Sequence, residues 1–151
     1  MKRILVGYDG SDGSRRALGR AAELAQAFHA EVVVAAVEEL VPIVAAAEPF
    51  GYVPAAEESL ALVQPPVDTH RLVEEAAQVV QEATEDVPVE VVSTMGPPDR
   101  ELVALVDQYN ADLLVVGTSE PGFVSRLLGG GTSQSVARRS SCDVLLVKPN
   151  S

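Results

Sequence analysis

The sequence predicts an α/β fold, a doubly wound five-stranded parallel sheet with helices on both faces. Two observations support this prediction. Short apolar runs alternate with amphipathic segments of helical period along the 151 residues. The apolar runs do not alternate with polar residues, which is typical of strands that are covered on both faces. A regular succession of strands and helices favours right-handed crossovers and therefore a parallel sheet.

The expected elements follow from these runs. Five strands are expected, one on each apolar run: residues 2–8, 31–37, 87–94, 113–116 and 144–147. Four helices are expected between the strands: residues 12–28, 68–83, 98–106 and 132–139. Each of the first three helical segments carries an apolar stripe at helical spacing.

Three of the expected helices begin with a recognisable signal. Ser11 follows a run of turn residues and is suited to be the N-cap of the first helix. Asp68 is suited to cap the second helix. Pro98 fits the first turn of the third helix, where the carboxylates of Asp99 and Glu101 favour the positive end of the helix dipole.

Residues 38–67 break the pattern of strands and helices. Five prolines interrupt this segment. A structureless stretch of this length is unusual inside a domain, so we expect an irregular surface loop or a lid. The sequence leaves open a short helix over residues 55–63. No internal repeat or second domain is apparent, and we expect residues 1–151 to form a single domain.

The charge and cysteine content limit the partners and the compartment. The chain has 11 Lys and Arg against 22 Asp and Glu, a net charge of −11 at pH 7. Such a field repels nucleic-acid phosphate and anionic lipid, so we expect neither nucleic acid nor a membrane as a partner. The apolar run near the start is too short for a signal peptide or a membrane helix. Cys142 is the single cysteine and suits a reducing, cytoplasmic environment, where we expect an inert thiol.

The expected topology locates a candidate ligand site. Doubly wound sheets bind ligands outside the carboxyl ends of their strands, where the strand order reverses. The residues of interest at these ends are Tyr8, Asp9, Val37, Glu38, Gly96 and Gly117.

The glycine-rich segment after the fourth strand, residues 117–133, is the most informative part of the chain. Its glycines allow the backbone to approach a ligand with N–H groups turned toward it. Thr132 and Ser133 open the last expected helix, and a helix N-terminus attracts anions. The segment therefore predicts a phosphate site that begins at Gly117 and Thr118. The alternative is a turn that merely joins the strand to the helix.

Four segments of the sequence resemble the universal stress protein family. They are residues 4–11 (ILVGYDGS), 111–118 (ADLLVVGT), 125–128 (SRLL) and 142–147 (CDVLLV), and they extend over nearly the whole chain. The resemblance implies a sheet with the strand order 3-2-1-4-5 and a homodimer. In the ATP-binding members of the family it also implies a cleft for an adenine nucleotide.

The phosphate loop departs from the pattern of those ATP-binding members. That pattern is glycine, two residues, glycine, nine residues, then glycine followed by Ser or Thr. Gly117 and Gly130 match it, whereas Glu120 replaces the second glycine and Gly131 replaces the hydroxyl residue. A carboxylate close to a triphosphate repels it, and Gly131 offers only its N–H. Thr132 or Ser133 is a substitute for the missing hydroxyl.

The residues that the family pattern assigns to adenosine match this sequence better than those assigned to the phosphates. By the resemblance, Asp9 stands where an acidic residue contacts the nucleoside, and Val37 stands where the backbone contacts adenine. AMP or cyclic AMP therefore fits the sequence as well as ATP does. The alternative for Asp9 is a turn residue whose carboxylate is satisfied by local backbone donors.

Other chemistries find less support in the sequence. Asp9, Thr118 and Lys148 imitate the acidic, hydroxyl and lysine residues of a phosphoacceptor receiver domain, but residues 94–96 lack the acceptor Asp after the third strand. His29 and His70 are the only histidines, and neither a nucleophile elbow nor metal-ligand spacing is present. We therefore expect no catalytic residues and no metal.

Two functional hypotheses follow. The first is a stress-response protein with an adenine-nucleotide cleft, acting as a sensor or carrier with at most slow nucleotide hydrolysis. The second is a ligand-independent homodimeric interaction module that keeps the fold without the site. In either case residues 144–147 are expected to form an edge strand that pairs with a second copy, because an exposed apolar edge is a liability unless it is covered. The alternative is a monomer in which residues 149–151 fold over this edge.

Overall fold

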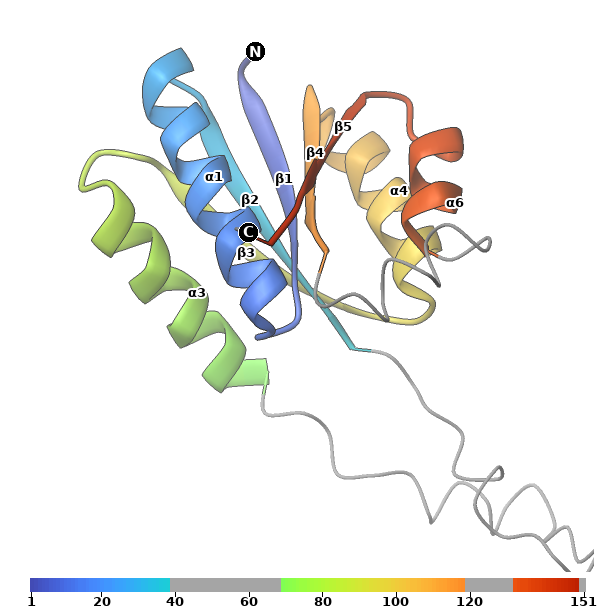
Figure 1. The fold of residues 1–151 in the computed structure, drawn as a ribbon, viewed down its shortest axis with the longest axis horizontal. Helices are drawn as coiled ribbons and strands as arrows, with labels where there is room; N and C mark the ends of the chain where they lie inside the picture. Colours follow the sequence, from blue (N-terminus) through green and yellow to red (C-terminus); the bar gives the residue numbers. More distant parts are fainter. Residues whose placement is uncertain (39–68, 119–131, 150–151) are drawn as a thin grey trace, which may run out of the picture.

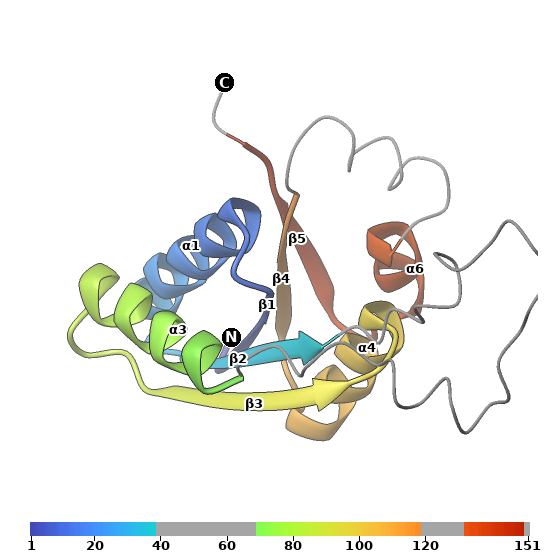
Figure 2. The ribbon, with the colours of Figure 1, turned by 90° about the horizontal axis from the view of Figure 1, so that it is seen from below.

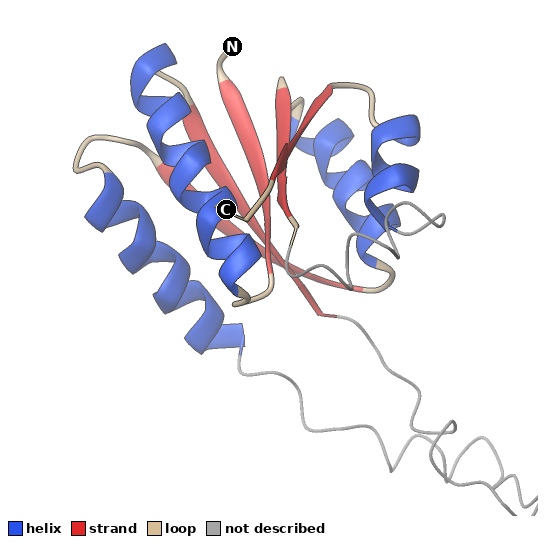
Figure 3. Cartoon of the chain, in the orientation of Figure 1, coloured by secondary structure: helices blue, strands red, loops and turns tan. Residues whose placement is uncertain are grey.

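The computed structural model describes residues 1–38, 69–118 and 132–149, which form nine helices and strands (Figures 1 and 3). In chain order these are β1 (Arg3–Tyr8), α1 (Asp12–Phe28), β2 (Glu31–Glu38), α3 (Thr69–Ala83), β3 (Val89–Met95), α4 (Pro98–Tyr109), β4 (Leu113–Gly117), α6 (Thr132–Arg139) and β5 (Asp143–Val147).

The strands form one parallel sheet in the order β3-β2-β1-β4-β5, which confirms the expected topology. Helices α1 and α3 cover one face, and α4 and α6 cover the other (Figure 2). The chain changes face between β1 and β4, because the connection after β1 leads to α1 and the connection after β4 leads to α6. This reversal is the place where such sheets bind ligands.

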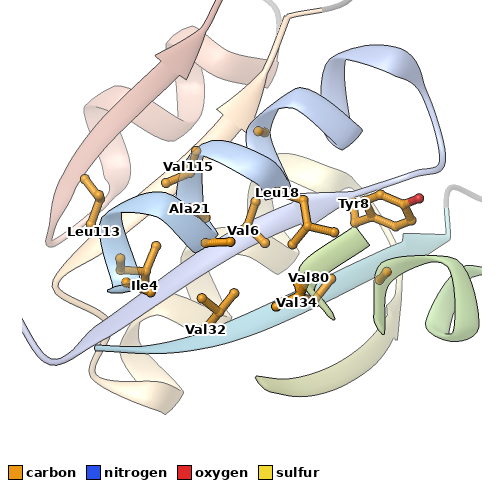
Figure 4. Close-up of a cluster of buried hydrophobic side chains, with 14 of the residues drawn as sticks. Ile4, Val6, Tyr8, Leu18, Ala21, Val32, Val34, Val80, Leu113 and Val115 are labelled. Carbon is orange, nitrogen blue, oxygen red and sulfur yellow. The ribbon is translucent and has the colours of Figure 1, made fainter. Parts of the chain in front are cut away.

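The core consists of two apolar layers, one on each face of the sheet. Ile4, Val6 and Tyr8 of β1 point toward α1 and α3, while Leu5 points toward α4 (Figure 4). The central strands are therefore apolar at consecutive positions, since both of their faces are buried. The scarcity of aromatic residues, 4% of the chain, agrees with a core of Val, Leu and Ala.

Helix α1 begins and ends as its sequence dictates. The Ser11 hydroxyl oxygen accepts the N–H of Ser14 at 3.2 Å, so the expected N-cap is confirmed. The helix ends at His29, which adopts a left-handed conformation with φ 54°. Small side chains on its buried face, such as Ala21 and Ala25, allow the helix to lie close to β1 and β4.

Several expected boundaries differ from the structure. β3 begins at Val89 rather than residue 87, because Pro88 has no N–H to give to the ladder, although its carbonyl accepts the N–H of Val32 at 2.9 Å. α4 continues beyond residue 106 to Tyr109. Glu38 belongs to β2 rather than to the irregular segment. The rest of that segment, its short helix over residues 55–63 and the cap at Asp68 lie outside the described residues.

The amino ends of the central strands are fastened by one carboxylate. Asp112, just before β4, accepts the backbone N–H groups of Lys2 at 2.7 Å and of Arg3 at 3.0 Å. These hydrogen bonds, that of Lys2 first, lower the pKa of Asp112 below its ordinary value of 3.8. The side chain of Arg3 adds bonds to the carboxylate of Glu31 and to the carbonyl of Tyr109. Strands β1, β2 and β4 are thus joined at the edge opposite the candidate site.

Within the described ranges 1–38, 69–118 and 132–149, no helix is both long and apolar enough to cross a membrane.

Candidate functional site

The candidate site lies at the carboxyl ends of β1, β2 and β4. Parallel pairing brings these ends to the same edge of the sheet, with β1 between β2 and β4. Asp9 follows β1, Val37 is near the end of β2, and Gly117 ends β4. Adjacent strands lie about 4.8 Å apart, so a ligand of nucleotide size reaches from the end of β2 to the end of β4.

Asp9 is exposed at this edge and is held by the turn that follows it. One carboxylate oxygen, Oδ1, accepts the N–H of Ser11 at 2.9 Å, and the N–H of Asp9 itself donates to the Ser14 hydroxyl at 3.4 Å. The alternative for Asp9, a carboxylate that accepts a hydrogen bond from a local backbone donor, is therefore present. It occupies one oxygen, and the second has no hydrogen-bond partner among the described residues. The turn fixes the orientation of the carboxylate and leaves an acceptor toward solvent.

Gly10 completes this turn with a left-handed backbone conformation, φ 81°. A Cβ atom at this position would also lie 3.0 Å from the Cδ2 atom of Leu72 in α3. Glycine is thus needed both for the conformation of the turn and for the packing of α3 beside it.

Val37 lies where β2 extends beyond β1. The register between β1 and β2 ends at the pair Tyr8 and Ala36, whereas β2 continues to pair with β3 through Val37 and Glu38. Val37 therefore lies past the end of β1, beside the turn that holds Asp9. Its side chain is half-buried and packs on the layer below α4.

Gly96 lies one strand further out, after β3. Its φ of 146° is accessible to glycine and rare for other residues, and it makes the turn into α4. The Thr94 hydroxyl donates to the carboxylate of Glu101 in the first turn of α4. The end of β3 is separated from Asp9 by β2, roughly 10 Å across two strand spacings. Gly96 thus lies two strands away from Asp9.

Gly117 has a packing role that the sequence analysis did not foresee. A Cβ atom built on it would lie 1.9 Å from the carbonyl oxygen of Gly13 and 2.9 Å from the N–H nitrogen of Ser14. The end of β4 therefore touches the backbone of the first turn of α1. The absence of a side chain at Gly117 makes this approach possible.

Thr118 is buried, with 4% of its surface exposed, and its polar groups are used within the protein. Its N–H and its hydroxyl both donate to the carbonyl of Val147 in β5, at 2.9 and 3.2 Å. Its own carbonyl accepts Nη2 of Arg16 at 3.2 Å. Thr118 thus joins the ends of β4 and β5 to α1.

Tyr8 is also buried, with its hydroxyl directed toward α3. The hydroxyl donates to Oε2 of Glu75 at 3.3 Å, and the same oxygen lies 3.4 Å from Nη2 of Arg15. Arg71 reaches Oε1 of Glu75 at 3.1 Å. The bond from Arg71, ahead of that from Arg15, lowers the pKa of Glu75, and burial raises the pKa of Tyr8.

The remaining expected residues belong to the phosphate loop and the start of α6. The structure begins α6 at Thr132, as expected. Glu120, Gly130 and Gly131 lie outside the described residues, and the side chains of Thr132 and Ser133 are not described. Ser135, in the first turn of α6, donates to Oδ2 of Asp99 in α4 at 2.9 Å. This bond ties the N-terminal ends of the two helices together.

Two charged groups at this edge escaped the sequence analysis. Arg15 and Arg16 could not be assigned a role from the sequence, because their partners, Glu75 and Thr118, are 60 and 102 residues away. The sequence does indicate that these two arginines have different neighbours, because consecutive residues of a helix point about 100° apart. Among the described residues, no group of three or more His, Cys, Asp or Glu side chains is placed to hold a metal ion.

The comparison with known proteins identifies the family. The model of the universal stress protein family matches residues 1–148, so the chain belongs to this family.

Relatives match over nearly the whole chain. Universal stress protein MJ0531 of Methanocaldococcus jannaschii is 32% identical, with 97% of this chain and 82% of that protein covered. A universal stress protein of Thermus aquaticus is 36% identical, with 97% and 98% covered. Among solved structures, a universal stress protein in complex with cAMP is 31% identical and superposes with a TM-score of 0.70, covering 97% of this chain and 95% of the other.

Proposed function

We propose that the chain binds an adenine nucleotide at the carboxyl edge of its sheet and acts in the stress response as a sensor or carrier. The observation that carries this proposal is the likeness to a universal stress protein solved with cAMP, at 31% identity and a TM-score of 0.70 over 97% of this chain. The free acceptor of Asp9, at the point where the strand order reverses, supports it.

Each part of the nucleotide has a proposed partner. The second carboxylate oxygen of Asp9 accepts a ribose hydroxyl, and the backbone of Val37, beyond the end of β1, faces the adenine ring. The phosphate side lies toward β4 and α6, at Gly117, Thr118 and the residues Gly130, Gly131, Thr132 and Ser133. Gly117 contributes through its backbone, whereas Thr118 contributes shape, because its N–H and hydroxyl are already bonded to Val147 and its carbonyl to Arg16. Tyr8 and Gly96 flank the site and contribute shape rather than hydrogen bonds.

The preferred ligand is a monophosphate, AMP or cyclic AMP. Glu120 brings a negative charge to the phosphate loop, and Gly131 removes a hydroxyl. Both changes weaken the binding of a triphosphate more than that of a monophosphate, because charge repulsion grows with each phosphate.

Calorimetric titration of the purified protein with cyclic AMP, AMP and ATP tests the proposal. We expect the two monophosphates to bind more tightly than ATP. Asp9→Ala is expected to weaken cyclic AMP binding about tenfold, the loss of one hydrogen bond to a charged group. Asp86→Ala, which removes an exposed carboxylate from the turn before the amino end of β3, away from the carboxyl ends of the strands, is the control. Absence of heat with all three nucleotides, or ATP as the tightest ligand, contradicts the proposal.

A second measurement isolates the two departures in the phosphate loop. Glu120→Gly combined with Gly131→Ser is expected to strengthen ATP binding by about 1–3 kcal/mol, because the repulsion is removed and a hydroxyl is restored. Binding of cyclic AMP is expected to change less. An unchanged affinity for ATP in this double variant shows that these residues do not set the preference.

The proposed role is binding rather than efficient catalysis. Tyr8 and Thr118 are bonded internally, and no hydroxyl donates to the Asp9 carboxylate among the described residues, so no base is paired with a nucleophile there. We expect at most slow hydrolysis of ATP, measured as released phosphate over hours. Multiple turnovers per second would contradict this role.

The second candidate is a ligand-independent homodimeric interaction module. The observation that favours it is the edge strand β5, which pairs only with β4 within the described chain and leaves Leu146 41% exposed. Mass spectrometry of protein released from a native preparation separates the candidates, because only the first predicts a co-purifying adenine nucleotide.

A further inference from the structure

Arg16 differs from the other arginines of α1 in having no acidic partner in the described part of the chain. Arg15 lies 3.6 Å from Asp12 and 3.4 Å from Glu75, and Arg20 lies 2.7 Å from Glu23. The difference is notable in a chain with a net charge of −11, where carboxylates are abundant.

The guanidinium of Arg16 lies at the carboxyl end of β4. Its Nη2 donates to the Thr118 carbonyl at 3.2 Å. Its Nε is buried and has no hydrogen-bond partner within the described ranges. A buried donor without an acceptor is unfavourable. Among the described residues, the bond from Nη2 to the Thr118 carbonyl is the hydrogen bond that holds the guanidinium in place.

The guanidinium of Arg16 holds the backbone carbonyl of Thr118. Thr118 is bonded to the Val147 carbonyl by its N–H and its hydroxyl, and to Arg16 by its carbonyl. Thr118, near the start of the glycine-rich segment, is therefore anchored from β5 on one side and from α1 on the other. The contact of Gly117 with Gly13 brings α1 close enough for this bond.

We propose that Arg16 is a positioning residue for the phosphate side of the site. It fixes the Thr118 carbonyl, and with it the point where the glycine-rich segment leaves the end of β4. Its positive charge has no acidic partner in the described ranges, and a phosphate on this side of the site would be attracted to it. The ligand in this inference is that of the proposed function. The part that concerns the bond between Arg16 and the Thr118 carbonyl does not depend on a ligand.

The ligand test compares cyclic AMP with adenosine in three variants. Arg16→Met keeps the apolar stem and removes the charge and donors, Arg16→Lys keeps the charge and one donor, and Arg20→Met is the control with the same charge change on the same helix. We expect Arg16→Met to weaken cyclic AMP about tenfold and to leave adenosine within about twofold. Arg16→Lys is expected to restore most of the affinity, and Arg20→Met to match the unchanged protein.

A second test needs no ligand. Hydrogen exchange of the Thr118 amide is expected to accelerate about tenfold in Arg16→Met and to remain slow in Arg16→Lys. The reason is that the backbone at Thr118 opens more often when its carbonyl loses the bond from Arg16. Exchange in β1, measured in the same experiment, is expected to stay unchanged, which separates a local effect from general destabilisation.

The outcomes are distinguishable. Equal losses for cyclic AMP and adenosine, or no loss for either, overturn the positioning role of Arg16. Unchanged exchange at Thr118 overturns it as well, whatever the ligands do. An unmodified protein that binds neither ligand overturns the proposed function, and the exchange measurement then still decides whether Arg16 fixes Thr118.

Discussion

The contact between Gly117 and Gly13 shows how one residue serves two purposes. In the sequence, Gly117 stands where the family resemblance predicts the first glycine of a phosphate loop. In the structure, its missing side chain lets β4 touch α1, with a notional Cβ only 1.9 Å from a backbone oxygen. Backbone atoms cannot move aside as the end of a flexible side chain does. The glycine is therefore required by packing, whether or not a ligand is present.

Substitution of this glycine has a predictable cost. Gly117→Ala is expected to lower the free energy of unfolding by at least about 2 kcal/mol, because either α1 or the end of β4 must shift. Chemical denaturation monitored by circular dichroism measures the change.

Gly19, on the same helix, is the matched control for that measurement. A Cβ atom there meets nothing within 4 Å. Gly19→Ala is expected to raise the free energy of unfolding by about 0.5–1 kcal/mol, since alanine is the better helix former. Equal effects of the two alanines would contradict the steric explanation.

At the scale of elements, β1 is fastened at its start by a carboxylate from the loop before β4. Asp112 binds two successive N–H groups, and its pKa is lower in the folded protein than its ordinary value of 3.8. A lowered folded-state pKa contributes stability above the unfolded-state pKa. That contribution is lost as the pH falls through the folded-state pKa.

The expected result is a stability difference that depends on pH. Asp112→Asn is expected to be less stable than the unchanged protein at about pH 6, with the difference shrinking toward about pH 3 as the carboxylate becomes protonated. Denaturant titrations at several pH values measure it. Asp86→Asn, which removes an exposed carboxylate without a hydrogen bond among the described residues, is the control. A difference for Asp112→Asn that is constant or grows on acidification contradicts the role assigned to Asp112.

The elements themselves were largely predictable from the sequence. Unbroken apolar runs and helical stripes are local signals, so all five strands and four helices fall where the sequence indicates. The errors are at boundaries, as at β3, where a proline postpones the ladder by two residues. The strand order came from the family resemblance, because local patterns do not specify which strands are neighbours.

The candidate site was predictable only in part. Asp9, Val37 and Gly117 share an edge because parallel strands bring their carboxyl ends together. The internal bonds of Tyr8 and Thr118 were not predictable, since their partners Glu75 and Val147 lie 67 and 29 residues away. Such pairs depend on the packing of α3 and β5, which no local pattern encodes.

At the scale of the whole molecule, β5 is the edge strand through which we expect two copies to associate. Val144 packs toward α4 and α6, Leu145 and Val147 pack toward α1, and Leu146 is 41% exposed. Antiparallel pairing of β5 with its copy would satisfy the outer backbone groups and cover Leu146.

Light scattering tests this association. The unchanged chain of 15.9 kDa is expected to have twice that mass at micromolar concentrations. Leu146→Asp is expected to shift it to the monomer mass, because a charge replaces an apolar contact at the edge. Phe28→Asp removes a side chain of similar exposure, 53%, at the end of α1 and is expected to leave the mass unchanged. A monomer mass for the unchanged chain rules out this dimer as a stable state.

The position of β1 in the sheet also bears on how the chain is made. β1 is translated first, yet it lies in the centre of the sheet, and the carboxylate that binds its first amides is 110 residues further along. At a synthesis rate of about 5–20 residues per second, β1 waits roughly 5–20 s for β4. Until β4 is made, the edge of β1 that pairs with β4 has no partner strand, and an open apolar edge is the kind of surface that chaperones cover. A ribosome-bound chain halted before residue 113 is therefore expected to need such cover, and one extended beyond β4 is not.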